Sequence, residues 1–158
     1  MSAKSKIQLT KDGLKELQNE LDELVNEKLP AVIKRISIAR DKGDLSENTE
    51  YQNAKEDKEI IDARISEIED VIKRAEVVNK TRSKTTIGIG SKVDTYPKNN
   101  KKNKKKIMIV GEFEGDVEKG KISIVSPLGK ALLGKKQGDE AVVSAPAGDI
   151  VYVVDKVK

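Results

Sequence analysis

Residues 40–51 read RDKGDLSENTEY and lie between two stretches that have the periodicity of amphipathic helices. Apolar residues before this segment recur at alternating steps of three and four, and the same rhythm returns after it. The segment itself carries four carboxylates and almost nothing apolar. Two apolar seams joined by a short polar segment predict an antiparallel helical hairpin whose turn is formed by these residues.

The two seams have similar lengths. The first comprises Leu14, Leu17, Leu21, Leu24, Val25, Leu29, Val32, Ile36 and Ala39, with a one-residue shift at Val25. The second comprises Tyr51, Ala54, Lys58, Ile61, Ile65, Ile68, Ile72 and Ala75, and Lys58 is its one residue that is not apolar. We expect Thr10 to cap the first helix, Pro30 to bend it or open its hydrogen-bond ladder, and Gly43 to end it. Each arm is about 40 Å long at the rise of an α-helix, so the turn protrudes.

Beyond Thr85 the sequence has the character of strands. Segments rich in Ile and Val alternate with Gly, Asn, Asp and Pro clusters, at residues 87–96, 105–113, 120–126, 140–146 and 149–157. A short helix is expected to begin at Ser126 and Pro127 and to stop at Gly134. The sequence therefore predicts an α+β chain, with an antiparallel coiled-coil hairpin over residues 1–78 and a small domain with a twisted antiparallel sheet over residues 79–158.

The composition excludes several kinds of site. The chain has no Cys and no His, which removes thiol nucleophiles, disulfides, thiolate or imidazole zinc sites and histidine acid/base catalysis. Carboxylates remain as ligands, and they favour Mg²⁺. The N-terminal sequence MSAKSKIQLT lacks the apolar run of a signal peptide, and no window approaches the roughly 20 apolar residues of a membrane span. We expect a soluble, cytoplasmic protein.

The charge is unevenly divided between the halves. Residues 1–78 carry 14 Lys and Arg against 18 Asp and Glu, whereas residues 79–158 carry 17 against 9. An acidic half joined to a basic half suggests a partner with mixed requirements, such as a nucleoprotein machine.

The carboxylates of the turn have two interpretations. Asp44 and Glu47 have the spacing of a capping box, in which both side chains would satisfy backbone N–H groups at a helix start. Ser46 competes with Asp44 for that cap. Alternatively, the two carboxylates hold a metal ion at the end of the rod. Mg²⁺ commonly takes one or two carboxylates and fills its other positions with water and phosphate, so such a site would need a partner.

Three motifs resemble the bacterial transcript cleavage factors of the Gre family, and the GreA type in particular. The turn with its flanks, ARDKGDLSENTEYQNAKE at residues 39–56, is similar to the tip of that family. The opening LTKDGLKELQNELDEL resembles its first helix start, and SPLGKALLGKKQGDEAVV resembles its C-terminal signature. The motifs agree in order and spacing over nearly the whole chain.

The resemblance implies a mechanism. Family members insert the coiled coil into the secondary channel of bacterial RNA polymerase, while a C-terminal domain of FK506-binding-protein-like (FKBP-like) fold docks at its rim. Asp44 and Glu47 match two essential acidic positions, which would hold a second Mg²⁺ shared with the polymerase active centre. The polymerase would then cleave nascent RNA whose 3′ end has backed out of register. The chain would be a cofactor of this reaction and no enzyme by itself, and we expect a monomer.

Other positions carry over from the same resemblance. Arg40 and Lys55 match basic residues that face the RNA 3′ end, although ordinary solvated helix charge is the alternative. The accessory positions at the tip are Asp41, Ser46, Asn48, Glu50 and Tyr51. Tyr51 also lies on the apolar seam, where packing is its expected role. The polymerase-docking positions are Ser126, Pro127, Gly129, Leu132, Leu133 and Gly134.

The segment PKNNKKNKKK, residues 97–106, departs from the family pattern because six of its ten residues are Lys. It has no interleaved aromatic residue to stack on bases, and a solvated hairpin loop is its simplest interpretation. Contact with nucleic acid or with an acidic polymerase surface is the alternative, and strong salt sensitivity would mark it.

Two other functions are compatible with the sequence. An inhibitory Gre-like paralogue would occupy the same channel without stimulating cleavage, and the intact GDLSENTEY tip favours the activator. An FKBP-type prolyl isomerase or chaperone is disfavoured by one Phe, no Trp and no evident aromatic pocket.

Overall fold

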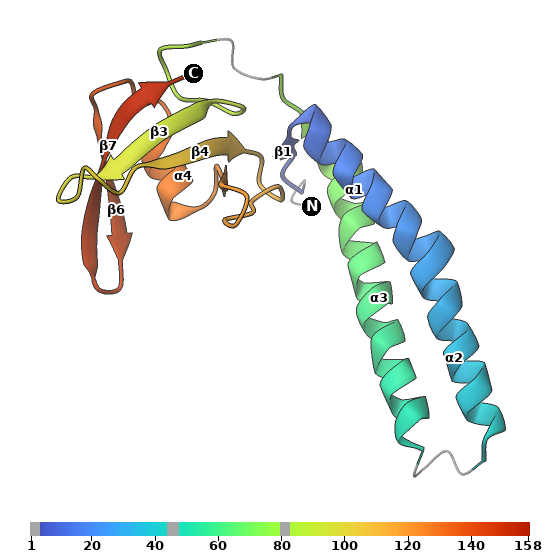
Figure 1. The fold of residues 1–158 in the computed structure, drawn as a ribbon. Helices are drawn as coiled ribbons and strands as arrows, with labels where there is room; N and C mark the ends of the chain where they lie inside the picture. Colours follow the sequence, from blue (N-terminus) through green and yellow to red (C-terminus); the bar gives the residue numbers. More distant parts are fainter. Residues whose placement is uncertain (1–3, 44–47, 80–82) are drawn as a thin grey trace. The chain divides into compact units, whose positions relative to one another are not determined.

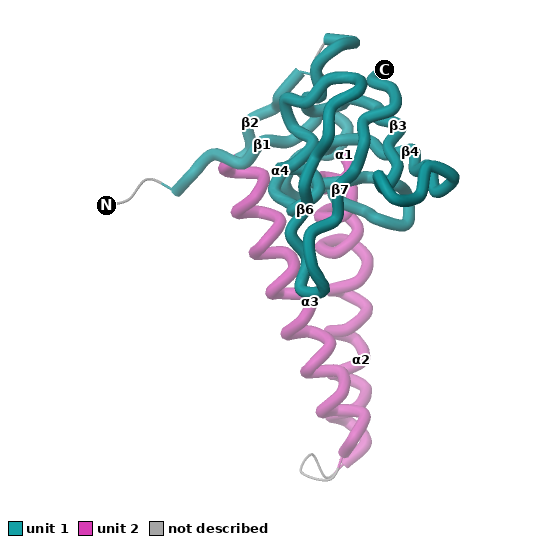
Figure 2. The backbone as a smooth tube through the Cα atoms, turned by 90° about the vertical axis from the view of Figure 1, so that its left-hand side faces the viewer, with its two compact units in different colours: residues 1–13, 75–158 teal, residues 14–74 magenta. Residues whose placement is uncertain are grey.

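A computed structural model of the chain describes residues 4–43, 48–79 and 83–158. It divides into two compact units (Figure 2): residues 14–74 form one, and residues 1–13 together with 75–158 form the other. The sequence-based division at 78/79 placed residues 1–13 and 75–78 with the hairpin, whereas the structure groups them with the sheet. The α+β class predicted from the sequence is confirmed.

The helical unit is an antiparallel hairpin, as predicted (Figure 1). Its first arm consists of α1 (Lys11–Glu23), a π-helical turn η1 (Leu24–Lys28) and α2 (Leu29–Asp41). Its second arm is α3 (Thr49–Arg74), of 26 residues. No described helix is long and apolar enough to cross a membrane.

The π-helical turn explains the one-residue shift in the apolar seam. The buried apolar positions of the first arm are Leu17, Leu24, Val32 and Ala39, at steps of seven, eight and seven. The Leu29 N–H donates to the Leu24 carbonyl, so this turn contains one extra residue. Pro30, which has no N–H to continue an α-helical ladder, follows immediately. The extra residue keeps both halves of the arm facing the same partner.

The second arm largely follows its predicted seam. Ala54 and Ile68 are buried, and Tyr51 and Lys58 are half-buried. Two positions differ from the prediction. Val25, at the seam shift, is 41% exposed, and Val71, absent from the predicted seam, is buried.

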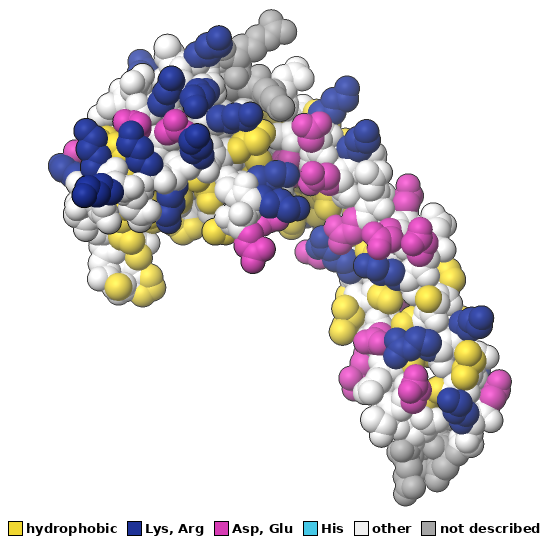
Figure 3. All heavy atoms as spheres, viewed as in Figure 1, with side chains coloured by type: hydrophobic (Ala, Val, Ile, Leu, Met, Phe, Trp, Pro, Cys, Tyr) yellow, Lys and Arg dark blue, Asp and Glu magenta, His cyan; other side chains and the backbone are white. Residues whose placement is uncertain are grey.

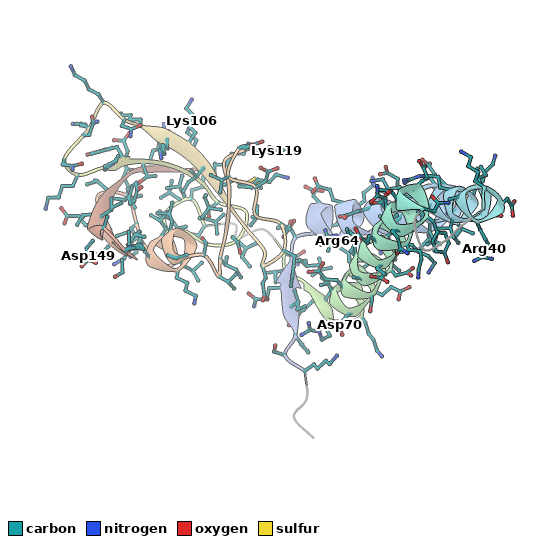
Figure 4. The ribbon with its side chains drawn as sticks, turned by 90° about the horizontal axis from the view of Figure 1, so that it is seen from below. Arg40, Arg64, Asp70, Lys106, Lys119 and Asp149 are labelled. Carbon is teal, nitrogen blue, oxygen red and sulfur yellow. The ribbon has the colours of Figure 1, made fainter. Side chains whose placement is uncertain are left out.

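An ion-pair cluster joins the arms beside the seam. Arg64 of α3 (Figure 4) donates from Nε and Nη2 to the two carboxylate oxygens of Glu20 on α1, at 2.7 and 2.9 Å. Its Nη1 also donates to Glu67 at 2.8 Å. The hydrogen bonds from Arg64 lower the pKa of Glu20 below its usual value, and those to Glu20 and Glu67 raise the pKa of Arg64.

Two short strands were missed by the sequence analysis. β1 (Ile7–Leu9) pairs in parallel with β2 (Ala75–Val77), where the helical pattern was expected to continue to Ala75. Strands of three residues are too short to give a periodic signal, and these are defined by their pairing.

Thr10 caps α1, as predicted, and also bonds to Glu114 within the unit that contains the sheet. Its Oγ1 accepts a hydrogen bond from the Gly13 N–H at 3.0 Å and pairs with the Glu114 carboxylate. The other Glu114 oxygen accepts from the N–H groups of Thr10 and Gly111, both at 2.8 Å. Every buried side-chain donor and acceptor among the described residues has a partner.

The second unit is built on a five-stranded sheet of order β5-β4-β3-β7-β6. The strands are β3 (Lys92–Pro97), β4 (Lys105–Val110), β5 (Lys121–Ser123), β6 (Glu140–Ala145) and β7 (Gly148–Val157). All pairs are antiparallel except β4 with β5, so the sheet is mixed and the expectation of a purely antiparallel sheet is corrected. Helix α4 (Pro127–Leu132) contributes Leu132 to the core formed with Val93, Ile107, Ile109 and Val154.

The Glu20–Arg64 pair predicts a dependence of stability on pH. A carboxylate whose pKa is lowered in the folded state stabilises that state above its unfolded pKa of about 4.3, and this contribution disappears as the pH falls through the lowered value. Both side chains are about 40% exposed, so Glu20→Gln should cost only about 0.5–1 kcal/mol at neutral pH. Denaturant unfolding at several pH values, followed by the circular dichroism signal of the helices, measures this difference in the free energy of unfolding.

Glu69→Gln is the matched control, because Glu69 is an exposed carboxylate of α3. Its stability should track the parent at every pH. A Glu20→Gln deficit that persisted unchanged in acid would contradict an ionic origin.

Candidate functional site

The first arm ends at the turn as the sequence predicted. The Lys42 N–H donates to the Ala39 carbonyl at 3.3 Å, and Gly43 follows with φ of +120°. A positive φ is readily adopted only by glycine, and it ends helices at this position. Gly43 is therefore confirmed as the residue that turns the chain out of α2.

Asn48 joins the two arms across the turn. Its Nδ2 donates to the carbonyl of Ala39, in the last turn of α2, at 2.7 Å. Its Oδ1 accepts from the Tyr51 N–H, in the first turn of α3, at 3.1 Å. One amide side chain thus accepts from an N–H at the start of α3 and donates to a carbonyl of α2 that also accepts from the Lys42 N–H, at a site where the buried Ala39 and Ala54 mark the seam.

The N-cap of α3 is therefore Asn48. The expectation that Asp44 or Ser46 caps this helix, with Glu47 completing a capping box, is wrong, because the first turn of α3 already has its cap. Asp44, Ser46 and Glu47 themselves lie outside the described residues. Their proposed metal-binding role stays a prediction.

The donor chemistry of the tip fits Mg²⁺. Residues 44–50 read DLSENTE and offer carboxylate, hydroxyl and amide oxygens, with neither imidazole nor thiolate. These are the ligands that hard divalent cations prefer. Asp41 and Glu50, the accessory acidic positions, are exposed on either side of the turn. In the described ranges no group of three His, Cys, Asp or Glu side chains could hold a metal.

A basic hollow lies beside the tip. It has a volume of about 640 Å³ and is lined by Ile33, Ile36, Ser37, Arg40, Tyr51, Lys55, Lys58 and Glu59. The structure thus brings Arg40 and Lys55, predicted from opposite arms, to one hollow (Figure 4 labels Arg40 at the tip end of α2). The Lys55 ammonium lies 5.4 Å from the centroid of the Tyr51 ring, within cation–π range.

Lys58 belongs to the same hollow and was not among the predicted site residues. It donates to Asp62 at 2.5 Å, one turn along α3. Its signal was present in the sequence, as the one polar residue of the second seam.

The C-terminal motif mainly builds its own helix. The Ser126 hydroxyl accepts from the Gly129 N–H at 3.0 Å and donates to the Ser123 carbonyl at 2.6 Å, so the predicted helix start is confirmed. A Cβ on Gly129 would meet that carbonyl oxygen at 1.9 Å. Leu132 is fully buried, and Gly134, with φ of +80°, ends the helix as expected.

Two of the six docking candidates, Pro127 and Leu133, are apolar and exposed. Pro127 lines a second hollow of about 510 Å³ together with Val125, Lys130, Ala131, Val142 and Ser144. Val125 and Val142 are 45% and 55% exposed, so this side of the sheet unit offers an apolar contact surface.

Comparisons with known proteins cover both units. The model for the N-terminal domain of transcription elongation factors matches residues 7–77, and that for the GreA/GreB C-terminal domain matches residues 82–158. The transcription elongation factor GreA of Rhodospirillum rubrum is 46% identical over 154 residues, with 97% of this chain and 98% of that protein covered. GreA of Amoebophilus asiaticus is 47% identical over 147 residues, covering 92% of each. Among solved structures, GreA factor homolog 1 of Thermus thermophilus is 30% identical with a TM-score of 0.45, covering 97% of this chain and 99% of that one.

Asn48 predicts a local stability effect. Asn48→Ala removes both the cap of α3 and the bond to α2, and should lower the free energy of unfolding by about 1–2 kcal/mol. Asn48→Asp keeps the cap acceptor but loses the donor to Ala39, so its stability should fall between parent and alanine variant. Denaturant unfolding of the full chain measures both. If the alanine variant unfolded like the parent, Asn48 would not join the arms.

Proposed function

Since the chain belongs to the Gre family of transcription elongation factors and is of the GreA type, we propose that it stimulates RNA polymerase to cleave backtracked RNA. The hairpin enters the secondary channel of the polymerase and brings residues 44–47 to its active centre. The observation that carries this proposal is the closure of the turn by Asn48. This closure presents a short acidic segment at the end of α3, an arm of about 39 Å.

The carboxylates of Asp44 and Glu47 hold the attacking water and a shared Mg²⁺ together with the polymerase. A bound Mg²⁺ in such a site lowers the pKa of its water and stabilises the developing charge on phosphate oxygens. Asn48 supplies the helix cap, so neither carboxylate is needed for that purpose. Two carboxylates do not make a complete site, so the chain acts as a cofactor of the polymerase and not as a nuclease.

The basic hollow binds the backtracked RNA. Arg40 and Lys55 line it together, and their charges attract the phosphates of the displaced 3′ segment. The Tyr51 ring limits the directions that the Lys55 ammonium takes. We therefore assign Arg40 and Lys55 to positioning of the RNA relative to the tip.

The sheet unit anchors the protein at the rim of the channel. The apolar exposed residues Val125, Pro127 and Val142 form the contact surface. A second contact on the same chain raises the local concentration of the tip at the active centre, so cleavage does not depend on strong binding by the hairpin alone.

The test separates charge from folding. Asp44→Asn and Glu47→Gln keep the size of the side chains and remove the charge. Each should reduce cleavage of RNA in backtracked complexes by at least about tenfold, which is the low end of the loss seen when only an outer-shell partner of a metal ligand is removed. Both should unfold like the parent and compete with it for polymerase. Added Mg²⁺ should restore part of the activity.

Asp22→Asn is the control, since it removes an exposed carboxylate of α1 distant from the turn along the chain, and it should stimulate cleavage as well as the parent does. Normal cleavage by both tip variants would refute the metal role. A parent protein that bound polymerase and slowed it without cleavage would be an inhibitor, and cleavage by the protein without polymerase would make it an enzyme.

A further inference from the structure

One face of the sheet is lined with lysines and is not covered by α4. The core residues Val93, Ile107 and Ile109 point to the face on which α4 packs. Because side chains alternate along a strand, the residues between them point the opposite way. On that outer face the register aligns Lys106 with Asp94 and Asp94 with Lys156, so that three strands form one row.

A second row lies beside the first. Lys92 is opposite Met108 on β4, and Met108 is opposite Lys121 on β5. On the other side of Lys92, its backbone exchanges hydrogen bonds with Lys158 at 3.2 and 2.8 Å. Neighbouring strands are about 4.8 Å apart and alternate residues of one strand about 6.6 Å apart, so the lysines of the two rows form a dense grid.

The face keeps a strong positive charge after its internal pairing. Lys158 pairs with Asp94 at 3.5 Å and Lys104 with Asp155 at 2.9 Å, and the latter hydrogen bond raises the pKa of Lys104. Within the described part of the chain, Lys92, Lys106 and Lys156 make no ion pair. The adjoining β3–β4 loop adds Lys101 and Lys102, both exposed. Figure 3 shows Lys and Arg side chains gathered over the sheet unit, and Figure 4 labels Lys106 on β4.

We propose that this lysine face binds the phosphate backbone of duplex DNA without reading its sequence. The surface is defined by Lys92, Lys106, Lys156, Lys158 and the loop lysines between β3 and β4. Its cations are all lysines, which are point charges without the planar fork of arginine, and this composition suits a diffuse array of phosphates better than individual carboxylates. Lysine is also depleted in protein–protein interfaces, whereas DNA-binding surfaces are strongly positive.

Single-stranded RNA fits the face less well. Stacking on exposed aromatic rings usually contributes to that binding, and the aromatic residue near the lysines, Tyr96, is half-buried. Duplex DNA has the denser array of charge and needs no stacking partner. The inference is independent of the cleavage function, because it concerns a different surface and requires no polymerase.

The experiment measures binding of the full chain to a labelled duplex by fluorescence anisotropy, over roughly 50 to 200 mM salt. The variant Lys92→Gln, Lys106→Gln, Lys156→Gln removes three exposed lysines of the face. Its affinity should fall at least about tenfold at low salt, and the slope of log K against log salt should decrease by about 3, one for each lost phosphate contact. Circular dichroism and unfolding check that the variant is folded.

Lys130→Gln, Lys135→Gln, Lys136→Gln is the matched control, with the same change of charge within or just after α4. It should retain the affinity and salt slope of the parent. Equal losses in both variants, or no binding of duplex at low salt, would overturn the proposal. Tighter binding to single-stranded RNA than to duplex DNA would identify RNA as the ligand of this face. Binding to polyglutamate as tight as to the duplex would identify acidic proteins instead.

Discussion

The helical unit depends on one apolar seam, because a two-helix hairpin has no other interior. Burial of Leu17, Leu24, Val32 and Ala39 on one arm must stay in phase with the other arm along its whole length. The steps of seven, eight and seven would rotate the arm out of phase if every turn were α-helical. The π-helical turn at Leu24–Lys28 absorbs the extra residue, next to the proline that would interrupt an α-helical ladder. The alignment of the two arms at the turn therefore depends on the π-helical turn at Leu24–Lys28, which is distant from the turn along the chain.

The ends of the hairpin show how structural and functional residues are separated. Thr10 caps the start of α1 and bonds to Glu114 within one unit, and Asn48 joins α2 to α3 within the other. Each polar side chain there satisfies backbone groups that a helix end leaves open. Asn48 supplies the side-chain cap of α3 at the tip, and the proposed cleavage function assigns the carboxylates of Asp44 and Glu47 to a metal ion and its water.

Much of this architecture could be predicted from the sequence. The seams, the caps at Thr10 and Ser126, and the stops at Gly43 and Gly134 follow from local chemistry that acts over one turn. The sequence did not identify Asn48 as the cap of α3 because Asp44, Ser46 and Asn48 are all good N-cap residues, and the bond of Asn48 to Ala39 on the other arm is visible only in the fold. The strands β1 and β2 and the rows of the lysine face depend on pairing between distant segments, which the sequence pattern does not encode. The roles proposed for Arg40 and Lys55 come from the resemblance, whereas the hollow that they share could be found only in the fold.

The central claim is that the tip of the hairpin reaches the active centre of RNA polymerase. The chain has no cysteine, so a single introduced cysteine can carry a photo-crosslinker at a defined place. Lys42→Cys labels the exposed end of α2, and Asp22→Cys labels α1, distant from the turn along the chain. In backtracked complexes the label at position 42 should crosslink to the RNA 3′ end and to the catalytic region of the polymerase, and the label at position 22 should not. Crosslinking of position 42 only to the outer surface of the polymerase, in complexes that are cleaving RNA, would contradict the account.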